Sequence, residues 1–184
     1  MSATINSRTT IHQGRVYELV SENITLENGV TTNIEFIHHP GAAGIVPMMD
    51  KEHIILIKQY RHALGEHIWE IPAGTRDPDE TVLSCAKREL IEETGYSAKN
   101  WIELSEITPV PGYSDERIQL FLAADMQAAQ QNLDQDEILN VHRVNFDEAL
   151  NMIQRGEIRD CKTISGLFLA HAWLQNKDQK GNQE

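Results

Sequence analysis

The stretch "GTRDPDETVLSCAKRELIEETGY", residues 74–96, decides how this chain is interpreted. Glu89, Glu92 and Glu93 crowd together within it, and Arg88 is one of only two nearby basic residues. On a helix the three glutamates fill one sector about 100° wide, beside an apolar seam. Like charges three or four residues apart destabilise an exposed helix by about 0.2–0.5 kcal/mol per pair, so this crowding calls for an explanation.

Two interpretations fit the glutamates taken alone. In the first, they form a solvated acidic face that Arg88 partly neutralises through an i, i+4 pair with Glu92. In the second, their oxygens bind a hard divalent cation such as Mg²⁺, which prefers carboxylate, carbonyl and phosphate oxygens.

The ends of the helix are also indicated by the sequence. Asp77 is a candidate N-cap, Pro78 suits the first helical position, and Glu80 stands three residues after the cap. Gly95 is a natural C-terminal glycine. We therefore expect one helix from Pro78 to the residue before Gly95.

Strands are expected on both sides of this helix. Their alternating or clustered apolar residues place them at 15–27, 31–39, 44–49, 53–60, 68–73, 101–107, 117–126 and 139–144. Asn28-Gly29 separates the first two and is a strong hairpin signal. Two more helices are predicted at 146–156 and 163–175. The predicted class is α/β (α+β), with an N-terminal antiparallel β region and a boundary near "HPGAAG".

Length and composition limit the class of protein. The chain has 184 residues, 40% hydrophobic and 24% charged, as expected for one folded domain with a small appendage. A formal net charge of -12 without a basic cluster argues against nucleic-acid binding. The N-terminus lacks an apolar leader segment and no run is long enough to span a membrane, so we expect a cytoplasmic protein with Cys85 and Cys161 as reduced thiols.

The spacing within residues 74–96 resembles the signature of the Nudix hydrolase family. That signature is glycine, five residues, glutamate, seven residues, Arg-Glu, an aliphatic, any residue, Glu-Glu, any residue, glycine and an aliphatic. The matching positions are Gly74, Glu80, Arg88, Glu89, Leu90, Glu92, Glu93 and Gly95. Tyr96 departs from it, because an aliphatic residue is usual there.

The resemblance extends to the ADP-ribose pyrophosphatase and nucleoside diphosphate sugar hydrolase branch through "HPGAAGIVPM", "IKQYRHALGEHIWEIPAG", "PGYSDE" and "GEIRDCKTISGLFLA". Pro111, sixteen residues past the box glycine, also matches that branch. The resemblance implies a Nudix α/β/α sandwich with a mixed sheet at residues 44–184. It also implies an N-terminal β region, residues 1–43, that exchanges strands across a homodimer.

The same resemblance implies metal ligands. Glu89 and Glu93 would be the main ligands, Glu92 a further one, and the Ala73 carbonyl a backbone ligand. The metal would be Mg²⁺, with Mn²⁺ as a substitute, because such ions neutralise a pyrophosphate and activate water. Glu80 and Arg88 are expected to tie the preceding loop to the helix.

Four residues are predicted to bind substrate. Arg61 matches a phosphate-binding arginine, and its planar guanidinium suits two phosphate oxygens; a surface arginine is the alternative. Glu70 is expected either to contact substrate or to support a residue that does. Ser114 and Glu116 in "PGYSDE" are candidate substrate contacts, with a plain turn as the alternative.

Glu137, in the acidic loop "LDQDE", is predicted to be the general base. Carboxylates committed to a metal are weak bases, and the resembling enzymes carry the base on a mobile acidic loop far past the box. Asp136 is the alternative if the alignment slips by one residue. The loop, including Asp134, could instead be a solvated turn.

The resemblance implies Mg²⁺-dependent hydrolysis of ADP-ribose to AMP and ribose 5-phosphate. A broader nucleoside diphosphate sugar hydrolase, acting on ADP-glucose or GDP-mannose, is the alternative among enzymes. A binding module that senses a nucleotide without cleaving it would have lost box glutamates, and this chain keeps all of them.

Overall fold

The computed structural model describes residues 3–133, 135 and 137–181. The chain forms two compact units. One unit contains residues 1–41 and 108–117, and the other contains residues 42–107 and 118–184. The division of the chain at residue 43 stays a prediction, and that prediction did not include the separate segment 108–117 in the first unit.

The first unit is built on a three-stranded antiparallel sheet in the order β1 (Thr4–Gln13), β2 (Glu18–Thr25) and β3 (Thr31–His38). β1 was not predicted. All ten of its residues are exposed, so its sequence carries no burial pattern that would mark a strand.

The hairpin predicted at Asn28-Gly29 joins β2 to β3 and is confirmed. The Leu26 N–H donates to the Val30 carbonyl at 2.9 Å, and Gly29 has φ 81°. That backbone conformation is accessible to glycine at little cost, which is why the turn forms here.

The second unit contains two sheets. Its strands are β4 (Ala42–Pro47), β5 (His53–Arg61), β6 (Glu66–Glu70), β7 (Ala73–Thr75), β8 (Tyr96–Ile107), β9 (Ile118–Ala128) and β10 (Leu139–Asn145). One sheet has the order β7-β4-β9-β8 and the other β10-β5-β6. β4 and β9 run parallel, whereas the remaining pairs are antiparallel, so the predicted mixed arrangement is confirmed.

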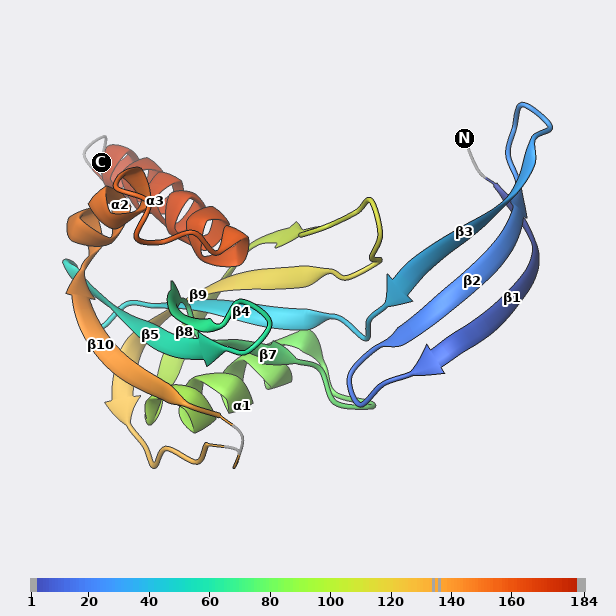
Figure 1. Ribbon diagram of the computed structural model, residues 1–184. Coiled ribbons are helices and arrows are strands. Elements are labelled where there is room, and N and C mark those ends of the chain that lie inside the picture. The colour runs from blue at the N-terminus through green and yellow to red at the C-terminus, as the bar shows by residue number, and fades with distance from the viewer. Residues whose placement is uncertain (1–2, 134, 136, 182–184) are drawn as a thin grey trace. The chain divides into compact units, whose positions relative to one another are not determined.

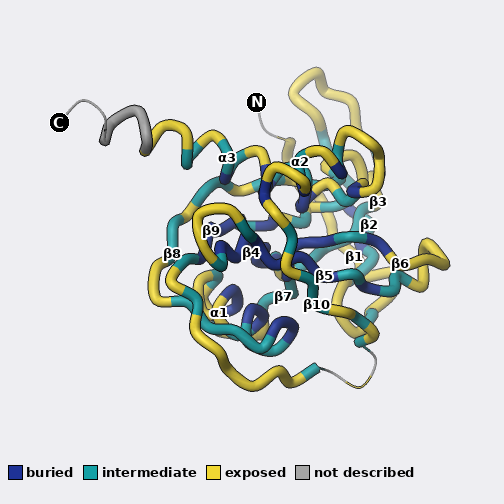
Figure 2. Tube along the Cα trace, turned by 90° about the vertical axis from the view of Figure 1, so that its left-hand side faces the viewer, coloured by how far each residue is buried: buried dark blue, intermediate teal, exposed yellow. Residues whose placement is uncertain are grey.

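Helices cover both faces of these sheets (Figure 1). α1 (Val82–Thr94) packs on the alternate residues Ala43 and Ile45 of β4. The neighbouring residues of β4 contribute to the core that contains α2 (Phe146–Gln154) and α3 (Cys161–Gly181). Figure 2 shows buried residues along β4 and on one side of α1. The period-2 alternation of a strand between two helical layers produces the sandwich.

The predicted start of α1 is wrong. The helix begins at Val82, and its N-cap is Thr81, whose hydroxyl accepts from the Ser84 N–H at 3.1 Å. Glu80 does reach back to the Asp77 N–H at 3.1 Å, but this contact closes a turn in which Asp79 has φ 62°. A residue in that conformation cannot continue a right-handed helix.

The predicted end of α1 is confirmed. Gly95 has φ 72°, and its N–H donates to the Ile91 carbonyl at 2.9 Å. None of the described helices combines the length and the apolar character that a membrane span requires.

Candidate functional site

The second unit brings Glu89 and Glu93 of α1 against the short strand β7. The side chains are almost fully buried, with 8% of Glu89 and 1% of Glu93 exposed. Glu93 accepts a hydrogen bond from the Ala73 N–H at 2.9 Å. A Cβ atom on Gly74 would lie only 1.9 Å from Glu89 Oε1, so the absence of a side chain at Gly74 makes room for this carboxylate.

Burial changes the acidity of both carboxyls. Desolvation raises the pKa of Glu89 to about 7, although the adjacent Arg88 opposes the rise. Desolvation, followed by the repulsion of Glu89, raises the pKa of Glu93 well above its ordinary value. Burial therefore favours the neutral, protonated form of both carboxyl groups.

Arg88 is the cation that lies within this group of carboxylates. It donates to both oxygens of Glu80 at 3.1 and 3.0 Å and to the Thr75 carbonyl at 3.0 Å, as expected for a residue that ties the loop to the helix. Its other nitrogen donates to Glu89 at 2.6 Å and to Glu92 at 3.0 Å. One guanidinium thus donates hydrogen bonds to the carboxylates of Glu80, Glu89 and Glu92. The predicted pair with Glu92 is present, but the neighbouring Glu89 and Glu93 are buried and do not form a solvated face.

The donors suit a hard divalent cation. Glu89 and Glu93 are buried carboxylates, Glu92 follows on the same helix, and the Ala73 carbonyl lies on the adjacent strand, which is an all-oxygen set. Over the described residues, no three His, Cys, Asp or Glu side chains already converge to hold a metal. Glu89 and Glu92 form ion pairs with Arg88.

Glu137 lies close enough to act on both carboxylates. Its negative charge contributes to the raised pKa values of Glu89 and Glu93. Its neighbour Ile138 accepts from the Tyr60 N–H at 3.0 Å, beside the end of β5. The general-base role of Glu137 stays a prediction, and the alternative Asp136, like Asp134, lies outside the described residues.

The segment before this loop is bonded to the end of α1. The Ala129 N–H donates to the Gly95 carbonyl at 2.8 Å, and the Asn132 N–H donates to the Glu92 carbonyl at 3.1 Å. Because these carbonyls have no partners within the helix, the bonds satisfy them. They also guide the chain from β9 towards the carboxylates.

Arg61 and Glu70, two of the predicted substrate-binding residues, form an ion pair. Arg61 Nε donates to Glu70 Oε2 at 2.8 Å, and a second Arg61 nitrogen donates to Oε1 at 3.2 Å. Glu70 is 2% exposed, whereas 40% of the Arg61 side chain is exposed. A buried carboxylate thus holds a partly exposed guanidinium, and the roles of Arg61 and Glu70 in substrate binding stay predictions.

Sequence reasoning missed the first turn of α3. Lys162 Nζ contacts Glu70 Oε1 at 2.5 Å, and Thr163 Oγ1 accepts from the Ile71 N–H at 2.8 Å. Lys162 is buried, as are Gly166 and Ala170 four and eight residues further on. A lysine in phase with a buried stripe of small residues is uncommon and is the signal that could have found it.

Ser114 and Glu116 lie in the first unit, and the contacts described for them are made there. Ser114 Oγ accepts from the Glu116 N–H at 3.1 Å, and Ser114 pairs with Ile37 of β3 as an isolated bridge. Glu116 lies 3.9 Å from His39 Nδ1. These contacts agree with the plain-turn interpretation, and the role of both residues in substrate binding stays a prediction.

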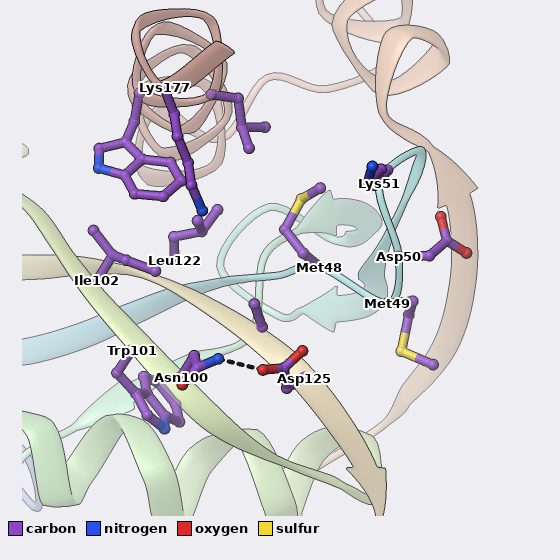
Figure 3. Close-up of a pocket in the computed structure, with 13 residues that line it drawn as sticks. Met48, Met49, Asp50, Lys51, Asn100, Trp101, Ile102, Leu122, Asp125 and Lys177 are labelled. Carbon is purple, nitrogen blue, oxygen red and sulfur yellow. Dashed lines mark hydrogen bonds between the residues drawn. The ribbon is translucent and has the colours of Figure 1, made fainter. Parts of the chain in front are cut away.

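A cavity of about 690 Å³ lies in the second unit beside α3 and strands β8 and β9 (Figure 3). Its lining includes Met48, Ile102 and Leu122, which also belong to the core or pack against it. Asp125 on its rim is bonded to Asn100. None of the predicted site residues lines this cavity, so we interpret it as a crevice at the margin of the core.

Comparisons with known proteins agree on a family. The family model described as the NUDIX domain matches residues 38–165. The ADP-ribose pyrophosphatase of Bacillus subtilis is 37% identical over 155 residues, covering 83% of this chain and 84% of the relative. The ADP-ribose pyrophosphatase of Mycobacterium tuberculosis is 33% identical over 172 residues, 92% of this chain and 83% of the relative. A crystal structure of an ADP compounds hydrolase superposes with a TM-score of 0.83 at 26% identity, covering 96% of both chains.

Proposed function

This chain belongs to the Nudix family, and from that premise we propose that it hydrolyses ADP-ribose to AMP and ribose 5-phosphate with the help of Mg²⁺. The predicted family, its ADP-ribose pyrophosphatase branch and its sandwich fold are confirmed, and the chain is a Nudix pyrophosphohydrolase. The observation that carries the proposal is the pair of buried carboxylates, Glu89 and Glu93, gathered beside Gly74.

The residues have distinct roles in the proposed reaction. Glu89, Glu92, Glu93 and the Ala73 carbonyl would hold Mg²⁺, or Mn²⁺ as a substitute. When bound, such an ion neutralises pyrophosphate oxygens and lowers the pKa of the attacking water. Arg61 would donate hydrogen bonds to phosphate oxygens on the side facing away from Glu70.

Glu137 would accept the proton of the water that attacks phosphorus. A new P–O bond then forms to the water oxygen, and the bond between phosphorus and the bridging oxygen breaks, leaving two monophosphates. The negative charge of Glu137 is felt by Glu89 and Glu93, so its carboxylate belongs to the same electrostatic neighbourhood, which supports this role.

A broader substrate range is the second candidate, since the ADP compounds hydrolase covers 96% of this chain. The deciding experiment is a panel of ADP-ribose, ADP-glucose, GDP-mannose, a dinucleoside polyphosphate and ATP with Mg²⁺, scored by released nucleoside monophosphate. We expect the highest kcat/KM for ADP-ribose. Comparable values for ADP-ribose and both other sugar nucleotides would favour the broader hydrolase, and a preference for ATP would refute both.

The panel also needs a control that separates this enzyme from contaminating hydrolases. The Glu93→Gln variant, purified in the same way, should release almost no monophosphate. Equal release by both preparations would show that another protein produces the signal.

We also propose that the chain is a cytoplasmic homodimer. Every residue of β1 is exposed, and the apolar side chains Ile5, Ile11 and Ile34 of the first unit are 58%, 51% and 44% exposed. A three-stranded sheet with this much exposed apolar surface is better stabilised by a second copy. Sedimentation at micromolar concentration should give twice 20.9 kDa, and a species of 20.9 kDa alone would contradict the proposal.

A further inference from the structure

The buried carboxylate of Glu70 connects the first turn of α3 to the predicted phosphate-binding arginine, Arg61. Glu70 Oε1 accepts from Lys162 Nζ at 2.5 Å and from Arg61 at 3.2 Å, and Oε2 accepts from Arg61 Nε at 2.8 Å. One carboxylate, 2% exposed, therefore lies between two cations.

The two cations differ in where they lie. The Lys162 side chain is 10% exposed, whereas that of Arg61 is 40% exposed. Lys162 is therefore the inner counter-ion of Glu70 and Arg61 the outer one. A buried carboxylate strongly requires a counter-ion, and Lys162 meets this requirement from inside the fold.

Asp160 does not replace Glu70 as the main partner of Lys162. Its carboxylate lies 3.1 Å from Lys162 Nζ, but it also accepts from the Thr163 N–H at 2.9 Å and from the Thr163 hydroxyl at 2.6 Å. These bonds place it at the start of α3, where the helix dipole offsets part of its negative charge.

We infer that Lys162 is a positioning residue that keeps the charge of Arg61 available for the diphosphate of the substrate. With Lys162 present, Glu70 orients the guanidinium through two of its five N–H donors without being its only counter-ion. Without Lys162, Glu70 would be neutralised by Arg61 alone. This inference rests on the proposed function, in which Arg61 binds phosphate.

The first experiment is the Lys162→Met variant, which keeps the aliphatic length and removes the charge. We expect the Kd for ADP-ribose, measured calorimetrically in EDTA, and the KM with Mg²⁺ to rise roughly ten- to hundredfold, the effect of one charge-assisted hydrogen bond. The kcat should change much less, because ground state and transition state lose the same contact.

The Glu70→Gln/Lys162→Met double variant tests the mechanism. Removing the buried negative charge frees Arg61 again, so the Kd of the double variant should be much lower than that of Lys162→Met and within about threefold of that of Glu70→Gln alone. If Lys162 touched the phosphates itself, the double variant would bind as weakly as Lys162→Met. If Lys162 were only structural, thermal stability would fall and the Kd would stay unchanged. Either of these last two results would overturn the inference.

Two further variants keep the test informative if Lys162→Met does not fold. Because the uncharged side chain of Glu70→Gln needs no counter-ion, the double variant should fold where Lys162→Met does not, and its Kd should lie within about threefold of that of Glu70→Gln alone. A tenfold weaker Kd in the double variant than in Glu70→Gln would contradict the inference. Arg159→Met is the control near the start of α3. It removes an exposed ion pair in which Arg159 lies 2.8 Å from Glu66, and it should leave the Kd unchanged. If the unmodified chain neither binds nor cleaves ADP-ribose, that result refutes the proposed function itself. A refutation of the Lys162 inference alone requires an unmodified chain that does bind ADP-ribose.

Discussion

A substitution at Gly74 can displace the carboxylate of Glu89, the proposed metal ligand, without disturbing the core. In Gly74→Ala the new Cβ would lie 1.9 Å from Glu89 Oε1, 2.0 Å from its Cδ and 2.4 Å from Oε2. Non-bonded carbon contacts below 3.0 Å essentially never occur, so the carboxylate has to withdraw by at least about 1.1 Å. The obstructed atoms are the far end of a flexible side chain, so the backbone need not move.

We expect Gly74→Ala to lose about 10²-fold in kcat/KM for ADP-ribose, the usual effect of misplacing a catalytic group by about 1 Å. The dependence on Mg²⁺ should shift to higher concentrations, because Glu89 is the ligand that moves. Thermal stability should stay within about 1 kcal/mol, since no core atom is removed. The assay is monophosphate release across a Mg²⁺ titration, with thermal unfolding of the same samples.

Gly156→Ala is the matched control. Gly156 has φ 74° and open space around its Cα, so alanine there costs about 1–2 kcal/mol of backbone energy and touches no carboxylate. This variant should lose stability and keep its kcat/KM. In a Glu89→Ala background, Gly74→Ala should cause no additional loss. Unchanged kcat/KM in Gly74→Ala, or an additional loss in that background, would refute the reasoning.

Three other predictions concern the same carboxylates. Glu93→Gln should reduce turnover by orders of magnitude and leave the fold intact; near-normal turnover at saturating Mg²⁺ would rule out Glu93 as a ligand. Glu137→Gln should lower kcat roughly 10²–10⁴-fold with little change in substrate binding, and an unimpaired variant beside an impaired Asp136→Asn would move the role to Asp136. In the metal-free chain, the pKa of Glu89 is raised from 4.5 to about 7, so the folded state keeps a proton that the unfolded state releases above 4.5. Stability should therefore fall as the pH rises from about 5 to about 8, and Glu89→Gln should flatten this slope; an unchanged slope in that variant would contradict the reasoning.

The carboxylate helix could be predicted because its information is local. Once the segment is helical, the spacing of Glu89, Glu92 and Glu93 places all three side chains on the same side of the helix. Gly95 ends the helix because glycine readily adopts the left-handed backbone conformation found there. The start of the helix is different, since both Asp77 and Thr81 are acceptable caps. Tertiary contacts of the preceding loop through Arg88 select Thr81, and residue preferences alone do not include them.

Two features could not be predicted for physical reasons. β1 has no buried face within its own unit, so periodicity gives no signal for it. The role of Lys162 depends on Glu70, which is 92 residues away along the chain, and no local pattern links the two. The signal that remained was a charged residue in a buried helical stripe.

The contacts between α3 and the strand region have a consequence for the timing of synthesis. Ile71 bonds to Thr163 and Glu70 to Lys162, and each pair is separated by 92 residues. A chain still emerging from the ribosome can form α1 and its glutamates long before residue 163 has left the exit tunnel. Until then Glu70 lacks its inner counter-ion and the Ile71 N–H lacks its buried acceptor. Nascent chains should therefore remain unable to cleave nucleoside diphosphate compounds until residues 162 and 163 have left the exit tunnel and packed against Glu70 and Ile71.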